Sequence, residues 1–360
     1  MNEQKPTIVV AVSGGVDSSV VAAMLTKSGY PVIGVMMHLW SEEGKECENK
    51  CCTPQAMEDA RKSAQTLGFP FYTIDAADIF RKRIVQYFLD GYAAGKTPNP
   101  CVNCNREIKW GLLLDKAKEL GGDFLATGHY VRRELAENGK VIVKKARDSL
   151  KDQSYVMSML NQSQLKHTLF PLGDYLKTEV RDMAREFKLP MAEKKDSQDL
   201  CFVSDVSYKD FLLRNAPEVA IPGVIFDKFG NKLGEHQGLA FYTIGQRKGI
   251  GIAAPEPLYV LDKDPLNNSI IVGTVLDLNQ ESIIAKDVNW ISGEIPANVQ
   301  NIQVKIRYKA GYQIASLEPL ENNRVTVHFD TPVRDATPGQ FAVFYDGDIV
   351  LGGGEITKSV

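Results

Sequence analysis

The chain has 360 residues, enough for two or three domains, and its 44% hydrophobic and 24% charged residues are typical of a globular protein. A formal net charge of −3 argues against a general nucleic-acid binder, although local basic tracks can occur on such a background. No run approaches the ~18 consecutive apolar residues of a membrane span, and residues 1–5 do not resemble a signal peptide, so we expect a cytoplasmic protein with no membrane contact and reduced cysteines.

Strand and helix patterns alternate along the first half of the chain. Continuous apolar runs predict buried strands, and apolar residues at helical spacing predict the helices between them. The predicted strands are 7–12, 31–37, 69–74 and 124–127, and the predicted helices are 18–28, 53–67, 79–92 and 107–120. This alternation indicates an α/β domain with a parallel sheet covered on both faces.

Short strand patterns replace the helical ones beyond residue 214. β-rich runs occur at 238–243, 258–261 and 269–273, followed by predicted strands at 304–308, 324–329, 340–345 and 349–352. Short strands at such spacing are typical of a small barrel or sandwich. We therefore predict an α/β catalytic domain over 1–214, a small β-rich central domain over 215–277 and a C-terminal β domain over 278–360. Basic clusters at 81–83, 144–147, 194–195 and 305–309 are interpreted as solvated surfaces.

A glycine-rich loop, Ser-Gly-Gly-Val-Asp-Ser-Ser over 13–19, joins the first predicted strand to the first predicted helix. Its glycines let backbone amides approach a ligand closely, and the helix that follows directs its N-terminal amides at the same place. Ser13, Ser18 and Ser19 add hydroxyl donors for phosphate oxygens. The loop lacks the lysine of a Walker A motif. We interpret it as a phosphate-binding loop rather than as a tight turn with a serine cap.

Asp17 is the unusual member of this loop. A carboxylate beside a polyphosphate is repelled unless a cation or a protein partner intervenes. We therefore place Asp17 among the catalytic residues, on the Mg²⁺ side of the nucleotide. The string resembles the signature of the ATP pyrophosphatase (PP-loop) superfamily, whose members cleave ATP between the α- and β-phosphates and form adenylated intermediates.

The six cysteines suggest chemistry at sulfur. Cys101 and Cys104 precede the helix predicted to begin near Glu107, and a helix N-terminus lowers the pKa of a thiol. By itself the Cys-x-x-Cys pair also fits a redox pair or half of a zinc site. Cys201 follows a polar stretch that suits an exposed loop sulfur, although a lone cysteine is often a small buried residue. Cys47, Cys51 and Cys52 lie in a charged insertion and fit surface thiols, a zinc site or spare redox sulfurs.

The motifs in combination resemble the bacterial tRNA-specific 2-thiouridylase family over essentially the whole chain. This resemblance implies a PP-loop (adenine nucleotide α-hydrolase-like) domain, a small central domain and a C-terminal β-barrel that contacts tRNA. It also implies ATP-dependent 2-thiolation of the wobble uridine, position 34, of tRNA. The motifs that carry it, in chain order, are Ser13–Ser19, Gly34–Met37, Asn99–Trp110, Ala126–Tyr130, Lys151–Tyr155, Asp196–Phe202, Thr243–Gly249 and Thr337–Gln340.

The resemblance implies roles for individual residues. The residues it implies for ATP are Ala11, Val12, Ser13, Gly14, Gly15, Val16, Asp17, Ser18, Met37 and Gly128. The positions it implies for tRNA contact are Asn99, Pro100, Cys101, His129, Lys151, Asp152, Gln153, Arg307, Tyr308 and Gln340. ATP and Mg²⁺ are the implied cofactors, and tRNAs for Lys, Glu and Gln are the expected partners.

The implied chemistry activates a poor leaving group. Transfer of AMP to the C2 oxygen of uracil lets a sulfur nucleophile add at C2 and expel AMP, while pyrophosphate leaves at the first step. By resemblance, Cys201 carries a persulfide received from a donor such as a cysteine desulfurase or a sulfur-relay protein. Cys104 is the partner nucleophile, and a transient Cys104–Cys201 disulfide is reset by a reductant. The single-stranded anticodon loop makes extrusion of the base inexpensive.

One departure from the family leaves a second mechanism open. Many members have aspartate where this chain has Cys101, so Cys101, Cys104 and Cys201 could hold a [4Fe–4S] cluster that carries sulfide. We favour the persulfide account. Two other functions remain as alternatives. A different PP-loop enzyme, such as an amidotransferase-type synthetase or a lysidine-forming enzyme, would need no cysteines, and a non-enzymatic RNA-binding module would use the loop only structurally.

Overall fold

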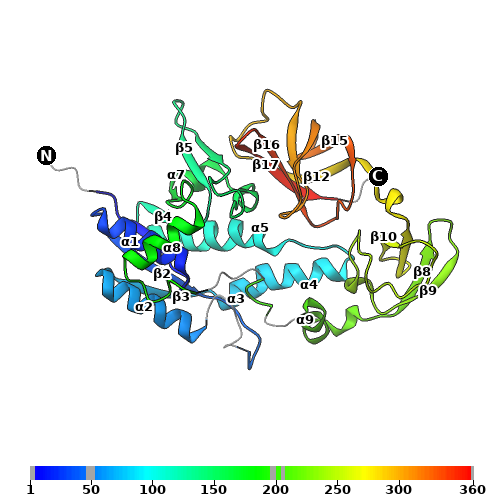
Figure 1. Ribbon diagram of the computed structural model, residues 1–360, viewed down its shortest axis with the longest axis horizontal. Coiled ribbons are helices and arrows are strands. Elements are labelled where there is room, and N and C mark those ends of the chain that lie inside the picture. The colour runs from blue at the N-terminus through cyan, green and yellow to red at the C-terminus, as the bar shows by residue number, and fades with distance from the viewer. Residues whose placement is uncertain (1–4, 46–52, 195–199, 204–206, 358–360) are drawn as a thin grey trace.

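The computed structural model describes residues 5–45, 53–194, 200–203 and 207–357, and the helices and strands named below belong to this part of the chain. The first domain is built on a parallel sheet with the strand order β3-β2-β1-β4-β7 (Figure 1). The strands are β1 (Ile8–Ala11), β2 (Val32–His38), β3 (Phe71–Asp75), β4 (Phe124–Ala126) and β7 (Thr168–Leu169). The predicted parallel sheet is confirmed.

Helices cover both faces of this sheet. Ile8 and Val10 of β1 belong to the apolar cluster under α1 (Val16–Lys27), α2 (Pro54–Leu67) and α8 (Lys177–Glu186). Val9, between them, belongs to the cluster on the opposite face, together with Trp110. Successive side chains of a strand point to opposite faces, and burial of both faces explains the continuous apolar run in the sequence.

Two long helices extend from the sheet toward the rest of the molecule (Figure 1). Each contains a π-helical stretch between α-helical ends, a feature that is frequent at functional sites. The first consists of α3 (Ala77–Phe80), η1 (Arg81–Val85) and α4 (Gln86–Ala93). The second consists of α5 (Pro100–Cys104), η2 (Asn105–Leu113) and α6 (Leu114–Glu119).

The central domain shares a core with the first of these helices. Phe88 of α4, Phe211 of α9 and Ile225 of β8 belong to one apolar cluster. The central sheet has the order β10-β11-β8-β9 and is preceded in the chain by α9. These elements are α9 (Tyr208–Asn215), β8 (Gly223–Asp227), β9 (Lys232–His236), β10 (Tyr259–Asp264) and β11 (Ser269–Gly273). The predicted boundary at 214 therefore falls within α9.

The β-rich run at 238–243 does not form a strand. Residues Leu239–Phe241 form a short 3₁₀ helix, and all three side chains are buried. A short apolar run does not distinguish a buried strand from a buried turn. Gly238, with φ +144°, sets the turn that precedes it.

The C-terminal domain is a closed six-stranded barrel. Its strands follow the order β12-β15-β14-β13-β16-β17, and β12 also pairs with β17. They are β12 (Gln280–Trp290), β13 (Ile302–Lys305), β14 (Gln313–Leu320), β15 (Arg324–Val333), β16 (Phe341–Asp346) and β17 (Ile349–Ile356). A Cβ atom at Gly352 would lie 2.0 Å from the Asn289 carbonyl oxygen, so a glycine is needed where the barrel closes.

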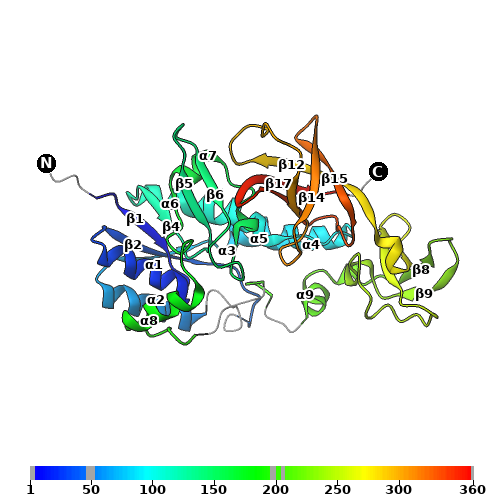
Figure 2. The ribbon, with the colours of Figure 1, turned by 45° about the horizontal axis from the view of Figure 1, so that its top comes forward.

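A hairpin of the first domain extends the barrel sheet (Figure 2). The hairpin consists of β5 (Arg132–Leu135) and β6 (Val141–Lys144), and β6 pairs with β17. The short helix α7 (Gln162–Lys166) lies beside it. Among the helices of the described ranges, none combines the length and apolar character needed to cross a membrane.

Candidate active site

The glycine-rich loop lies between β1 and α1, at the carboxyl edge of the parallel sheet. Gly15 is the N-cap of α1 and its helix end has no side-chain cap. The Ser13 backbone amide donates to Ser18 Oγ at 3.1 Å, and the two serine hydroxyl oxygens lie 3.3 Å apart. The loop thus gathers hydroxyl groups and helix amides at one place, an arrangement that suits phosphate oxygens.

Two glycines are required here by close backbone approach. Gly14 has φ +67°, and a Cβ atom on it would lie 2.2 Å from the Ala56 carbonyl oxygen in the first turn of α2. A Cβ atom on Gly128, which follows β4, would lie 2.9 Å from the Ser18 backbone nitrogen. The structure therefore brings together Gly14, Ser18 and Gly128, three of the residues predicted to bind ATP.

The remaining residues predicted for ATP surround this loop. Ala11 and Met37 are half-buried at the ends of their strands, and Val12 and Val16 are buried in the core. Their side chains hold the loop against the sheet, so any contact with a nucleotide would come from their backbone or from Met37.

We expect Gly14→Ala to lower both ATP-dependent AMP formation and the free energy of unfolding. A non-glycine residue in the left-handed region costs about 1–2 kcal/mol, and the contact with backbone adds to that cost. Gly68→Ala is the matched control, because Gly68 has φ +77° but nothing lies within 4 Å of an added Cβ. Urea unfolding and AMP release measure the two effects; equal losses in both variants would contradict the role of the close contact.

Asp17 is held by two protein partners. Lys177 Nζ, on a side chain that is 10% exposed, lies 2.7 Å from Oδ1 and 2.8 Å from Oδ2 of Asp17. The Tyr130 hydroxyl donates to Asp17 Oδ1 at 2.8 Å. A carboxylate beside a polyphosphate needs a cation or a protein partner, and Lys177 is that partner in the structure. Lys177 is the first residue of α8. The sequence did not identify it, because no glycine-rich loop or cysteine pair marks the residues around it.

Lys194 connects the loop to the segment that leads to Cys201. Its Nζ donates to the Gly14 carbonyl oxygen at 3.0 Å and lies 3.3 Å from Asp59 Oδ2. Its side chain is 42% exposed, so this lysine lies on a solvated surface as predicted, although it also contacts these two groups of the protein. Lys195 and residues 196–199 lie outside the described residues.

The cysteine pair lies on a helix that begins earlier than predicted. The Asn99 side chain accepts from the Val102 backbone amide as an N-cap, and Pro100 occupies the first helical position. Asn followed by Pro is a strong helix start, which outweighs the absence of apolar periodicity before Glu107. The exposed Cys101 lies in the first turn, whereas Cys104 lies in the second turn, where the helix dipole favours a thiolate less.

Cys104 and Cys201, which are far apart in sequence, border the same apolar cluster. Both are half-buried, and both pack against the apolar cluster that contains Phe88 and Phe202. Cys101 is instead exposed. Cys47, Cys51 and Cys52 lie outside the described residues.

The three thiols do not form a metal site in this structure. Among the described residues, which include Cys101, Cys104 and Cys201, no three His, Cys, Asp or Glu side chains are grouped closely enough to hold a metal ion. Cys101 is also exposed, whereas Cys104 packs against the apolar cluster. The thiols thus do not fit an iron–sulfur cluster as they stand.

His129 is oriented inward. Its Nδ1 lies 2.8 Å from Thr127 Oγ1 and its Nε2 lies 3.1 Å from Lys109 Nζ. Burial, followed by the Lys109 ammonium, lowers the pKa of His129 well below its ordinary 6.5. The ring is therefore neutral, accepts from Lys109 at Nε2 and donates from Nδ1. Lys109, on the π-helical stretch η2, is a second cation that was not predicted from the sequence.

His129 should make the fold sensitive to acid. The pKa of His129 is lower in the folded protein than in the unfolded chain. As the pH falls below the ordinary pKa, the unfolded chain therefore binds a proton that the folded site rejects, and the folded state loses stability. Between pH 6.5 and 5, the free energy of unfolding of the wild type should fall more steeply than that of His129→Gln, by up to about 1.4 kcal/mol per pH unit. Urea unfolding at pH 7.5, 6.0 and 5.0 measures the slopes, with the exposed His328→Gln as control. Parallel slopes for wild type and His129→Gln would contradict this.

The segment 151–153 joins the loop region to the barrel. The Tyr130 amide donates to Gln153 Oε1 at 3.0 Å, and the Tyr308 hydroxyl donates to the Asp152 carbonyl oxygen at 3.2 Å. The Lys151 amide donates to the Asp148 carbonyl oxygen at 3.1 Å. The predicted tRNA contacts Lys151, Asp152, Gln153 and Tyr308 are thus neighbours in space.

The barrel docks on the loop before α5 through its Thr-Pro-Gly-Gln motif. The Asn99 amide donates to the Gly339 carbonyl oxygen at 3.1 Å, and Gln340 Nε2 donates to the Thr97 carbonyl oxygen at 2.8 Å. Two of the predicted tRNA contacts, Asn99 and Gln340, therefore also join the domains.

Arg307 is largely buried. Its Nη2 donates to the Ile244 carbonyl oxygen at 3.2 Å, to the Asp335 carbonyl oxygen and to Thr337 Oγ1. Its guanidinium connects the barrel to the central domain, and burial lowers its pKa. The interpretation of 305–309 as an entirely solvated surface is wrong at this residue.

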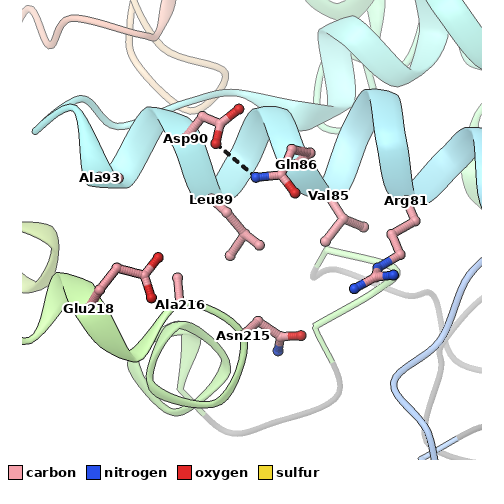
Figure 3. Close-up of a pocket in the computed structure, with 9 residues that line it drawn as sticks. All are labelled: Arg81, Val85, Gln86, Leu89, Asp90, Ala93, Asn215, Ala216 and Glu218. Carbon is pink, nitrogen blue, oxygen red and sulfur yellow. Dashed lines mark hydrogen bonds between the residues drawn. The ribbon is translucent and has the colours of Figure 1, made fainter.

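A pocket of about 100 Å³ lies elsewhere, between the helix α4 and the chain after α9 (Figure 3). Val85 and Leu89 point across it toward Asn215 and Ala216, and Gln86 Nε2 donates to Asp90 Oδ1 at 2.8 Å. None of the predicted site residues lines it, so it is separate from the candidate active site.

Comparisons with known proteins agree with this arrangement. A family model described as the tRNA methyl transferase HUP domain matches residues 6–205. Residues 209–274 match a tRNA methyl transferase PRC-barrel domain, and residues 280–356 match an aminomethyltransferase β-barrel domain. The three parts occur in the order expected from the sequence.

Curated relatives match over nearly the whole chain. The tRNA-specific 2-thiouridylase MnmA 1 of Caldanaerobacter subterraneus subsp. tengcongensis is 48% identical over 357 residues, which cover 98% of each chain. The protein of that name from Moorella thermoacetica, MnmA, is 47% identical and covers 96% of this chain and 98% of its own. MnmA of Clostridium perfringens is 43% identical over 354 residues, with 98% of each chain covered.

Proposed function

Because this chain belongs to the tRNA-specific 2-thiouridylase family, we propose that it adenylates the C2 oxygen of the wobble uridine and replaces that oxygen with sulfur from a cysteine persulfide. The enzyme is a tRNA-uridine 2-sulfurtransferase of the PP-loop class, and it uses ATP, Mg²⁺ and tRNA. The order of the steps, the sulfur donor and the roles of individual residues are parts of the proposal.

The glycine loop would hold the triphosphate. Amides of the first turn of α1 and the hydroxyls of Ser13 and Ser18 face the same place. Gly128, which has no Cβ, allows the backbone after β4 to approach the backbone of Ser18 closely. Lys177 neutralises Asp17, so the loop does not repel polyphosphate. Mg²⁺ would offset charge on the leaving pyrophosphate, and we propose that Asp17 faces it. The uridine C2 oxygen attacks the α-phosphorus, a C2–O–P bond forms, and the bond to pyrophosphate breaks.

The sulfur step uses two cysteines. The terminal sulfur of a Cys201 persulfide attacks C2 and AMP leaves with the original oxygen. The Cys104 thiolate then attacks the inner sulfur of Cys201, so that a Cys104–Cys201 disulfide forms and the electron pair of the S–S bond stays on the 2-thiouridine sulfur. Two electrons from a thiol reductant reopen the disulfide. The observation that supports this order of reaction steps is the packing of Cys104 and Cys201 against one apolar cluster.

The cluster mechanism receives less support. The Cys101 side chain is exposed, whereas Cys104 is half-buried, and the described thiols are not grouped for metal binding. We therefore propose no step through an iron–sulfur cluster. We propose tRNAs for Lys, Glu and Gln as substrates and a cysteine desulfurase or sulfur-relay protein as the donor.

The test is a complete reaction with tRNA, ATP, Mg²⁺ and a persulfide donor, prepared anaerobically and analysed for iron. Mass spectrometry of nucleosides should show one 2-thiouridine for each AMP and pyrophosphate, in protein that contains no iron. Cys101→Asp separates the two mechanisms, because it removes one of the three thiolates proposed for the cluster but keeps both cysteines of a Cys104–Cys201 cycle. Loss of thiolation in Cys101→Asp, with iron bound to the wild type, would contradict the persulfide proposal.

A further inference from the structure

Two lysines and two exposed tyrosines gather where the barrel meets the hairpin β5–β6. Lys145 follows β6, Lys305 ends β13, and Tyr308 and Tyr312 lie in the connection from β13 to β14. Lys145 Nζ lies 3.8 Å from the ring centre of Tyr312. Lys305 Nζ lies 5.2 Å from that ring centre and 5.7 Å from that of Tyr308. We call these four residues the lysine–tyrosine cluster.

The two tyrosine rings are held in place by buried rings. Tyr308 meets Tyr155 edge-on with ring centres 5.9 Å apart, and Tyr312 meets Tyr345 in the same way at 5.2 Å. Tyr308 and Tyr312 nevertheless remain 37% and 38% exposed. Burial, followed by Asp152, raises the pKa of both phenols, that of Tyr312 to about 12, so both rings are uncharged. Fixed and partly exposed aromatic faces are the surfaces on which unpaired bases stack.

The two ammonium groups have no carboxylate within ion-pair distance among the residues that the structure describes. Within the described part of the chain, neither Lys145 nor Lys305 forms an ion pair, and Lys145 Nζ donates to Gln303 Oε1 at 2.8 Å. Burial lowers the pKa of both. The nearby carboxylates are engaged elsewhere: Asp152 accepts from backbone amides, and Asp348 pairs with Arg132 at 2.7 Å. Neighbouring cations that are partly withdrawn from water are stabilised by an anionic ligand, such as a phosphate.

The cluster adjoins the residues predicted to surround the target base. The Tyr308 hydroxyl donates to the Asp152 carbonyl oxygen at 3.2 Å, and the Tyr308 ring meets Tyr155 of the short 3₁₀ helix Ser154–Met157, which packs against α5. Cys101 lies in the first turn of α5, directly after Asn99 and Pro100. A nucleotide on the cluster would thus be next to a base held at the start of α5.

We propose that the lysine–tyrosine cluster binds the anticodon-loop nucleotide next to the modified uridine. Its base stacks on the Tyr312 ring and its phosphate lies between Lys145 and Lys305. The inference rests on the proposed function, because it takes tRNA as the substrate. Stacking on an aromatic face accepts any base, so this site adds affinity and position without reading the sequence.

The experiment uses the full-length protein and an anticodon stem-loop RNA with 2-aminopurine beside the target uridine. The wild type and Tyr312→Phe should bind the RNA with equal affinity and quench the 2-aminopurine fluorescence. Tyr312→Leu should bind the RNA about tenfold more weakly and leave the fluorescence unquenched. Lys145→Gln and Lys305→Gln should each reduce the slope of log K against log salt by about 0.7. Tyr72→Leu and Lys27→Gln are matched controls, since Tyr72 is 48% exposed on β3 and Lys27 Nζ lies 4.1 Å from the Phe187 ring centre.

Two failures are distinguishable. Thermal unfolding of each variant verifies that it is folded. A wild type that thiolates tRNA, with Tyr312→Leu and Lys305→Gln binding RNA like their controls, would overturn the inference and leave the proposed function intact. A folded wild type that does not thiolate tRNA under the complete conditions would instead contradict the proposed function.

Discussion

Cys201→Ser is expected to abolish 2-thiouridine formation, by about a thousand-fold or more, while AMP transfer to tRNA continues. A hydroxyl group cannot carry a sulfane sulfur, but the ATP site is formed by other residues around Gly14 and Gly128. Cys104→Ser should produce a different defect. The persulfide sulfur would add to C2 and expel AMP, but the tRNA would stay joined to Cys201 through a disulfide, because the Cys104 thiolate that breaks this bond is missing.

Mass spectrometry of the protein after a single turnover separates these outcomes. The wild type should contain a Cys104–Cys201 disulfide before reductant is added, Cys104→Ser should contain tRNA joined to Cys201 through a disulfide, and Cys201→Ser should contain neither. Serine nearly matches the size of cysteine, and both positions are half-buried, so the variants should fold. Full thiolation by Cys201→Ser would contradict the mechanism and favour a PP-loop enzyme that needs no cysteine.

Lys177→Met is expected to raise the KM for ATP and to lower AMP formation by about a hundred-fold. The substitution keeps the apolar stem of the side chain but leaves the Asp17 carboxylate, 2.7 Å from the missing ammonium, without its cation beside the phosphate loop. Truncating one partner of a buried charge pair costs about 2–5 kcal/mol, and the 31% exposure of Asp17 places this case near the lower end.

A double-mutant cycle isolates the pair. Asp17→Asn combined with Lys177→Met removes both charges, so the free energy of unfolding should recover relative to Lys177→Met alone. AMP formation should not recover if Asp17 also faces Mg²⁺. Additive losses of stability in the double variant would show that the two side chains do not interact, and unchanged ATP kinetics in Lys177→Met would remove this lysine from the site.

The sequence alone determined the elements that depend on neighbouring residues. The apolar runs located β1, β2 and β11 to within about two residues, and the string over 13–19 identified the turn before α1. Local patterns suffice there because strand burial and helix capping involve residues close along the chain. The start of α5 was locally encoded as well, in Asn99 and Pro100, but was placed too late because apolar periodicity was given more weight than the cap.

The tertiary structure alone decided which distant residues meet. The pairing of β6 with β17, the shared core of α4 and α9, the Lys177–Asp17 ion pair and the inward orientation of His129 all join segments that are separate in the sequence. Such contacts depend on how whole elements pack, and a lysine or histidine has the same local pattern whether it faces solvent or a buried partner. The sequence therefore specified the chemistry present, and the fold determined where each group acts.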